Sequence, residues 1–440
     1  MTHDGPATAS GSEPRTRGGD RTRRRSLIVS FAAMGVASST VPAVLPTIAA
    51  RAGGELSQFL PGVSILFAAL LVGVLIVSAA HRVQPLVFLF AGSILLAIAI
   101  LILAGADTRT VFFLASATAG LGFGLVESSA SILARWLAAR ETPAALAGLN
   151  GAAAVSAAAC PILISAASSL GSLATGLVVL ALLPVANALL AGRAWKGAAR
   201  GSRGTSSSGR VDAPRGVSAT REESATREDS ATREDPATRR SRPSRGVIGI
   251  LPIALALFLF VGVETVFSGW SSVLPLDLLK LDPQEASLGT SAFWILMAAG
   301  RYLAAAIIKR GVRPLPYLAV TQAAGSVVLA IAAVLGACSA AAELVLAGVA
   351  VLLLAPGYAL ILGLALRAVS DRAARRVTGV LVAIGAAGGS AIPFVFALAA
   401  GTRTPLLLGL AAVTLLGSLA STILHAALAQ RIGTRAAAGI

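Results

Sequence analysis

A chain of 440 residues in which 56% of the residues are hydrophobic and 13% are charged is too apolar to be a water-soluble globular protein. Its net charge of +16 would suit a nucleic-acid partner, but the basic residues gather at the ends of long apolar segments, as they do in membrane proteins. We therefore expect a chain that lies in a lipid bilayer and binds no nucleic acid.

The first half of the chain is predicted to cross the membrane six times within residues 26–192, after a basic tail of residues 1–25. A helix needs about 20 apolar residues to span roughly 30 Å of hydrocarbon. Four segments reach this length first: 26–50, 56–80, 83–106 and 110–134. The uncharged stretch 142–192 is too long for one crossing, and the turn-forming residues Ser168–Ser172 divide it into two.

Residues 193–245 interrupt the apolar pattern. They are rich in Ser, Gly, Arg and acidic residues, and the hexapeptide Ser218–Glu223 recurs in variant form as Ser224–Asp229 and Ser230–Asp235. A segment of this composition cannot bury a core. We expect a disordered cytoplasmic linker that tethers two membrane units, with a regulatory role as the alternative.

Six further crossings are predicted within residues 246–430, before a short tail of residues 431–440. Their segments are 247–271, 288–308, 315–336, 344–366, 377–402 and 404–430. Landmarks of the first half recur here at a common offset, since Arg135, Arg140 and Pro161 find counterparts in Arg367, Arg372 and Pro393. The pattern predicts an all-α membrane protein of twelve transmembrane helices, built as two six-helix bundles in parallel repeat.

The basic residues also predict the orientation, because short loops rich in Arg and Lys face the cytoplasm. Loops on the side of the two termini carry Arg82, Arg135, Arg140, Lys309, Arg310, Arg313, Arg367, Arg372, Arg375 and Arg376. The opposite loops carry only Arg51, Arg109, Lys280 and Arg403. We expect a multi-pass protein of the cell inner (plasma) membrane, with both termini and the linker in the cytoplasm.

Charges inside predicted spans are candidates for function, because each costs roughly 3 kcal/mol at mid-helix and is rarely left facing lipid. Glu127 and Arg301 lie at equal depths, each eight residues before a basic residue at the cytoplasmic edge, so we predict an ion pair between them. Glu264, the one acid found within the predicted spans of the second half, is expected in the outer third of the membrane. Either acid could carry a proton or bind substrate, or form a structural pair instead.

Three further side chains complete the candidate site. Trp294 lies two helical turns before Arg301 and shares its helix face, so its ring could stack on a sugar. Asn150 is predicted to contact substrate or to bond a neighbouring helix. Trp270 is expected to be an interfacial aromatic residue first and a ligand contact second. The small-residue face of Gly120 and Gly124, which also carries Glu127, is expected to line a cavity rather than to pack helices.

Several segments carry a resemblance to a known family. Two parallel six-helix units joined by a long cytoplasmic loop resemble the major facilitator superfamily. Gly120–Glu127 and Leu149–Gly151 are similar to the fourth and fifth helices of its fucose/proton symporter branch. Val261–Glu264 with Gly269-Trp270, and Phe293-Trp294 with Gly300-Arg301, are similar to the seventh and eighth helices. The loop signature after the second helix is degraded, since His81 stands where the superfamily has an aspartate.

The resemblance implies a secondary active transporter that works by alternating access around a midplane cavity, functions as a monomer without cofactors, and carries a sugar or similar solute, with protons as the coupling ion. The branch has an acid on its first helix, but residues 26–50 contain none, which shifts any proton coupling onto Glu127 or Glu264. A drug/proton antiporter is the alternative within the class, with Cys160-Pro161 as an echo of the antiporter motif. A membrane receptor is the alternative outside it. A membrane-embedded enzyme would need clustered acids or metal ligands, which the sequence lacks.

Overall fold

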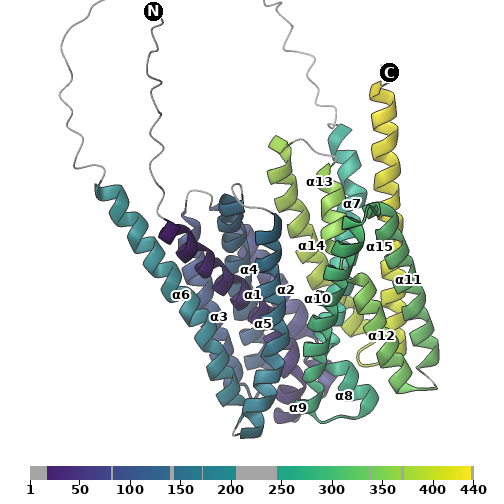
Figure 1. Cartoon of the computed structure of the whole chain (residues 1–440). Coiled ribbons are helices and arrows are strands. Elements are labelled where there is room, and N and C mark those ends of the chain that lie inside the picture. The colour runs from purple at the N-terminus through teal and green to yellow at the C-terminus, as the bar shows by residue number, and fades with distance from the viewer. Residues whose placement is uncertain are drawn as a thin grey trace, which may run out of the picture.

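A computed structural model of the chain describes residues 17–80, 83–138, 143–170, 172–204, 245–336, 338–367 and 371–437. The predicted linker core, 205–244, and His81 and Arg82 lie outside the described residues. Regular structure in the described part is helical throughout, which confirms the all-α prediction. Figure 1 shows the helices running side by side in two groups, one formed by the helices before the predicted linker and one by the helices after it.

The first group contains one helix for each predicted crossing. Its members are α1 (Arg17–Arg51), α2 (Pro61–Ala79), α3 (Pro85–Ala104), α4 (Arg109–Ala138), α5 (Pro143–Leu170) and α6 (Leu173–Gly204), with the single 3-10 turn η1 (Leu56–Gln58) before α2. Helix α4 packs against α2 and α3, α3 packs against α6, and α1 packs against α5. These contacts make the group a bundle, which we call the N-terminal bundle.

The second group contains the remaining helices and is called the C-terminal bundle. Its members are α7 (Arg245–Trp270), α8 (Val273–Leu279), α9 (Pro283–Ala286), α10 (Leu288–Lys309), α11 (Pro314–Leu335), α12 (Ala340–Leu354), α13 (Gly357–Arg367), α14 (Asp371–Ala399) and α15 (Thr404–Ala437). Helix α7 packs against α14 and α15, and α11 packs against α12 and α15. Helices α12 and α13 form one crossing that is broken at Pro356, because proline cannot donate a backbone hydrogen bond to the preceding turn.

The apolar lengths of these helices suit a membrane. Within the described residues, eleven helical segments are long and apolar enough to cross one, and α5 contributes the shorter apolar part Gly151–Ala167. These twelve segments correspond to the twelve predicted crossings. Helices α1, α6 and α15 continue beyond their predicted apolar segments, to Arg17, Gly204 and Ala437, because hydropathy reports only the part of a helix that lipid can cover.

The glycines of α4 pack against another helix instead of lining a cavity. A Cβ atom on Gly120 or Gly124 would overlap the backbone carbonyl oxygens of Leu66 and Leu70 in α2. Both positions therefore require glycine so that the two helix backbones can approach closely. The expectation that this face lines the cavity was wrong for the two glycines, because helical spacing cannot tell close packing from a solvent-filled space.

The two bundles meet mainly where α2 packs against α14 and α5 against α10, and α1 also contacts the helices α7 to α10. One end of the molecule carries the start of α1, the end of α6, the start of α7 and the end of α15, and we call it the linker end. We call the opposite end the α8–α9 end. Figure 1 shows the bundles close together at the α8–α9 end and splayed toward the linker end.

Hydrogen bonds between the bundles hold the α8–α9 end together. The Ser390 hydroxyl donates to the Ser64 carbonyl oxygen at 3.0 Å, and the Gln284 side-chain amide donates to the Ser165 carbonyl oxygen at 2.8 Å. A third bond runs from the Ser272 hydroxyl to the carbonyl oxygen of Pro42. Each pair joins a residue of one bundle to a residue of the other, so these contacts must break if the bundles separate at this end.

Candidate functional site

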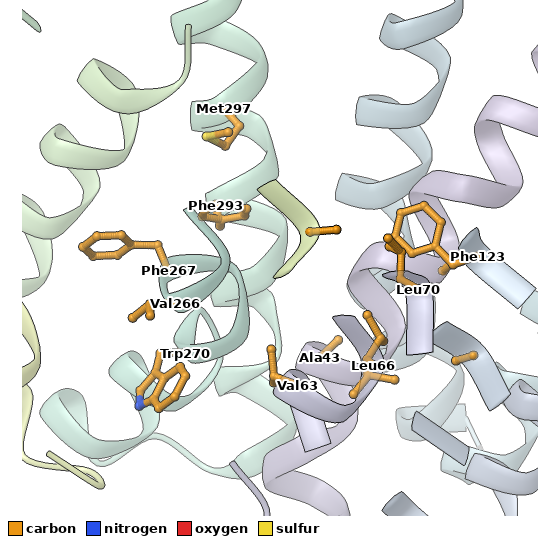
Figure 2. Packing of buried hydrophobic residues seen from close by; sticks show 14 of the residues in the cluster. Ala43, Val63, Leu66, Leu70, Phe123, Val266, Phe267, Trp270, Phe293 and Met297 are labelled. Atoms are coloured by element: carbon orange, nitrogen blue, oxygen red, sulfur yellow. The ribbon is translucent and has the colours of Figure 1, made fainter. Parts of the chain in front are cut away.

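A cavity of about 570 Å³ lies between the two bundles. Helices α2 and α4 line it from the N-terminal bundle, and α7, α10, α13 and α14 line it from the C-terminal bundle. Figure 2 shows Leu70 and Phe123 on one side and Phe293 and Met297 on the other; the first three of these line the cavity. The volume falls within the range of small-molecule binding sites.

The cavity extends toward the linker end and is closed at the other. Its lining reaches Ile308, one residue before the end of α10, and Val382 in the first half of α14. At the α8–α9 end, Val63 of α2 lies against Gly269 of α7, where a Cβ atom would touch the valine side chain. Figure 2 shows Val63 and Ala43 below Phe293, between Trp270 on one side and Leu66 on the other. A solute of cavity size could therefore enter from the linker end only.

Glu127 lies on α4 among apolar side chains of the cavity wall. Its side chain is partly exposed to the cavity, and among the described residues it takes part in no ion pair or hydrogen bond. The predicted ion pair with Arg301 was wrong, because Arg301 binds a different acid. Equal depth along two helices fixes a height in the membrane but leaves open which helix faces meet.

The acid that Arg301 binds is Glu264. Its carboxylate Oε1 accepts a hydrogen bond from Arg301 Nη2 at 3.0 Å, and Arg301 Nε donates to the Ala355 carbonyl oxygen at 3.2 Å. The arginine therefore connects α7 and α10 with the break between α12 and α13. Gly300 permits this contact, because a Cβ there would overlap the Leu352 carbonyl of α12.

Glu264 lies in the last two turns of α7, toward the α8–α9 end. Its place in the outer third of the membrane stays a prediction. Glu264 lines the same cavity as Glu127 and Arg301. With 19% of its side chain exposed, against 40% for Arg301, the pair borders the cavity and is reachable by a bound solute.

Trp294 joins these charged residues on the cavity wall, as predicted from its shared face with Arg301. Its ring packs edge to face against Phe293, with centroids 5.3 Å apart and an interplanar angle of 82°. Its indole Nε1 is buried and has no hydrogen-bond partner among the described residues. An unpaired buried donor is costly, so a bound acceptor would relieve that cost.

Of the remaining two predicted site residues, Trp270 is not brought to the cavity. Trp270 is 1% exposed, and its Nε1 donates to the Gly401 carbonyl oxygen at 3.3 Å, which makes it a packing residue of the α8–α9 end. Asn150 lies in α5, but its side chain lies outside the described part of the structure.

Sequence reasoning missed aromatic and acidic residues that the fold places in or near the membrane. Phe67, Phe123 and Tyr358 line the cavity, and none of them is charged; Phe123 lies within the segment Gly120–Glu127 but was not singled out. Glu343 lies in the first turn of α12, within a candidate span, and is 1% exposed, so Glu264 is not the one acid in the spans of the second half. Because Glu343 lies at the edge of an apolar segment, its position in the sequence predicted a loop residue. Within the described residues, no group of three or more His, Cys, Asp or Glu side chains could hold a metal ion.

Comparisons with known proteins agree with this architecture. A family model described as Major Facilitator Superfamily matches residues 27–397. No curated protein matches the sequence. Among solved structures, a mutant of the nucleoside transporter NupG has a similar fold, with a TM-score of 0.61 and 11% identity over 92% of this chain and 99% of that chain. At this identity the likeness shows the fold alone.

Proposed function

Because the chain belongs to the Major Facilitator Superfamily, we propose that it is a secondary active transporter that carries a small solute through the central cavity by alternating access. The observation that carries this proposal is a solute-sized cavity between two bundles that, within the described part of the chain, are joined by hydrogen bonds at the α8–α9 end. Separation of the bundles at the α8–α9 end, with closure at the linker end, would expose the same cavity to the opposite side.

Coupling to protons is part of the proposal, and Glu127 is the residue we assign to it. A carboxyl that faces the cavity without a basic partner among the described residues can bind and release a proton as the cavity changes sides. Glu264 is less suited to this role because its charge is already balanced by Arg301 at 3.0 Å. Proton transfer at Glu264 would leave the arginine charge unpaired in the membrane.

A sugar is one candidate solute, favoured by the resemblance of the fourth, fifth, seventh and eighth helices to the fucose/proton symporter branch. The cavity argues for a less polar solute, because among its described lining residues the polar ones beyond the charged residues are Thr265, Ser268, Tyr358 and Trp294. Sugar sites need a hydrogen-bond partner for nearly every hydroxyl group that is taken out of water. We therefore favour a solute with a substantial apolar surface, which is the kind of substrate that the drug-antiporter alternative requires.

A disulfide between the bundles at the α8–α9 end is expected to stop transport. In a Ser64→Cys/Ser390→Cys variant, with Cys160 and Cys338 replaced, the thiols would join positions that already share a hydrogen bond of 3.0 Å. Oxidation should block solute flux into proteoliposomes, and reduction should restore it, because the bundles could separate there only in the reduced protein.

The matched control is a disulfide inside one bundle at the same end. The hydroxyl oxygens of Ser271 and Thr290 lie 2.8 Å apart, and both residues belong to the C-terminal bundle. Oxidation of a Ser271→Cys/Thr290→Cys variant should leave flux unchanged. Equal flux in the oxidised and reduced forms of the inter-bundle variant, with the disulfide demonstrated by mobility, would refute alternating access at this interface.

The orientation of the transporter is proposed from the basic loops, which favour a cytoplasmic linker end. Reporters fused after Ser206, in the linker, and after Leu281, between α8 and α9, are expected to respond oppositely in cells. A phosphatase should be active only at Leu281 and a fluorescent protein only at Ser206. The reverse pattern would place the cavity opening shown by this structure outside the cell.

A further inference from the structure

The charge of the cavity limits which solutes it can hold. Among its described lining residues, the charged side chains are Glu127, Glu264 and Arg301. The last two neutralise each other at 3.0 Å, and Arg301 Nε is also engaged by the Ala355 carbonyl. The remaining charge among these described residues is the carboxylate of Glu127, so the described part of the ionised wall carries one net negative charge.

The aromatic side chains of the cavity wall also favour a positively charged solute. Aromatic rings reach the cavity from both bundles: Phe67 and Phe123 from the N-terminal bundle, and Phe293, Trp294 and Tyr358 from the C-terminal bundle. Aromatic faces attract cations and also cover apolar surface. Arg301 is already paired with Glu264, and Glu127 would repel an anion. A cation with an apolar body could instead pair with the Glu127 carboxylate and pack against the aromatic rings.

We propose that the cavity binds organic monocations with a bulky apolar or aromatic body, and that Glu127 supplies the counter-charge. This assignment rests on the transport function proposed above, because it takes the cavity to be the solute site. It names a substrate class that neither the family match nor the structural neighbour specifies.

The test uses a set of probes that differ in charge but share their aryl groups. Methyltriphenylphosphonium is the cation, triphenylphosphine oxide the neutral compound and methyltriphenylborate the anion, each with three phenyl groups. Binding to the purified full-length chain in a neutral detergent is measured by equilibrium dialysis, with protein-free micelles subtracted. We expect the cation to bind at least about tenfold more tightly than the neutral compound, because the Glu127 carboxylate attracts a positive charge across a cavity that is partly shielded from water.

Two variants then test whether Glu127 causes the preference for the cation. Glu127→Gln keeps the shape of the side chain and removes its charge, so the preference for the cation should fall to nearly none. Glu343→Gln, which neutralises a buried acid that does not line the cavity, should keep the full preference. If Glu127→Gln does not fold, the comparison of the three probes on the unaltered chain still decides whether the site prefers a cation.

Three outcomes would overturn the proposal: equal binding of cation and neutral compound, tighter binding of the anion than of the cation, or a preference that survives Glu127→Gln. Flux measurements on the same protein separate this proposal from the transport proposal. Cation preference at Glu127 without flux of any solute in proteoliposomes would refute transport alone. Flux of other solutes without cation preference would refute only the substrate class.

Discussion

Replacing Glu127 by Gln is expected to abolish proton-driven accumulation of the transported solute while sparing exchange at saturating solute. Glutamine preserves the size and hydrogen bonding of the side chain but cannot titrate. With one proton moved per solute, a gradient of one pH unit can sustain about a tenfold solute gradient, because each pH unit is worth about 1.36 kcal/mol. The variant should instead equilibrate solute to equal concentrations. Uptake into proteoliposomes, with and without a pH gradient, measures this difference.

Counterflow provides the internal control for that experiment. Exchange of labelled for unlabelled solute requires the cavity to change sides but requires no net proton movement, so Glu127→Gln protein that is correctly folded should still exchange. Glu343→Gln serves as the matched acid, because it removes a buried carboxyl outside the cavity and should keep full accumulation. Undiminished accumulation in Glu127→Gln would exclude Glu127 as the proton site.

The membrane crossings could be predicted from sequence because a bilayer imposes a length and a polarity on every segment that spans it. The recurrence of Arg135 and Pro161 as Arg367 and Pro393 also indicated a duplicated architecture. The break at Pro356 was not predicted, since it lies inside an uncharged segment that hydropathy treats as continuous. Apolarity locates a crossing, but it does not describe the backbone within that crossing.

The pairing of residues within the site was harder to predict from the sequence than the fold. Glu127, Glu264, Arg301 and Trp294 were identified because charges and tryptophans are conspicuous within apolar segments, and the structure places all four on one cavity. Which acid binds Arg301 depends on helix rotation and on the close approach of α10 to α12 at Gly300. Neither quantity is encoded in the spacing along a single helix.

The corrected pairing leads to a second large expected effect. Glu264→Gln and Arg301→Gln should each destabilise the protein, because each leaves one charge at the cavity wall without its partner. Since 40% of the Arg301 side chain and 19% of the Glu264 side chain are exposed, we expect losses of about 1–3 kcal/mol in unfolding free energy, below those of a fully buried pair. Titration with a denaturing detergent measures the unfolding free energy.

The double variant decides whether the two residues act as a pair. Its loss should be smaller than the sum of the single losses by about 1–2 kcal/mol, because the second substitution removes a charge that the first had already left unpaired. A parallel cycle on Glu127 and Arg301 should be additive within about 0.5 kcal/mol, since Glu264 is the acid that Arg301 contacts. The loss of unfolding free energy in Arg301→Lys should be smaller than in Arg301→Gln but greater than zero. A single ammonium group keeps the charge but lacks the separate Nε donor that reaches Ala355. Additivity of Glu264 with Arg301, together with coupling of Glu127 to Arg301, would restore the pairing that equal membrane depth had suggested and would transfer the proton-carrying role to Glu264.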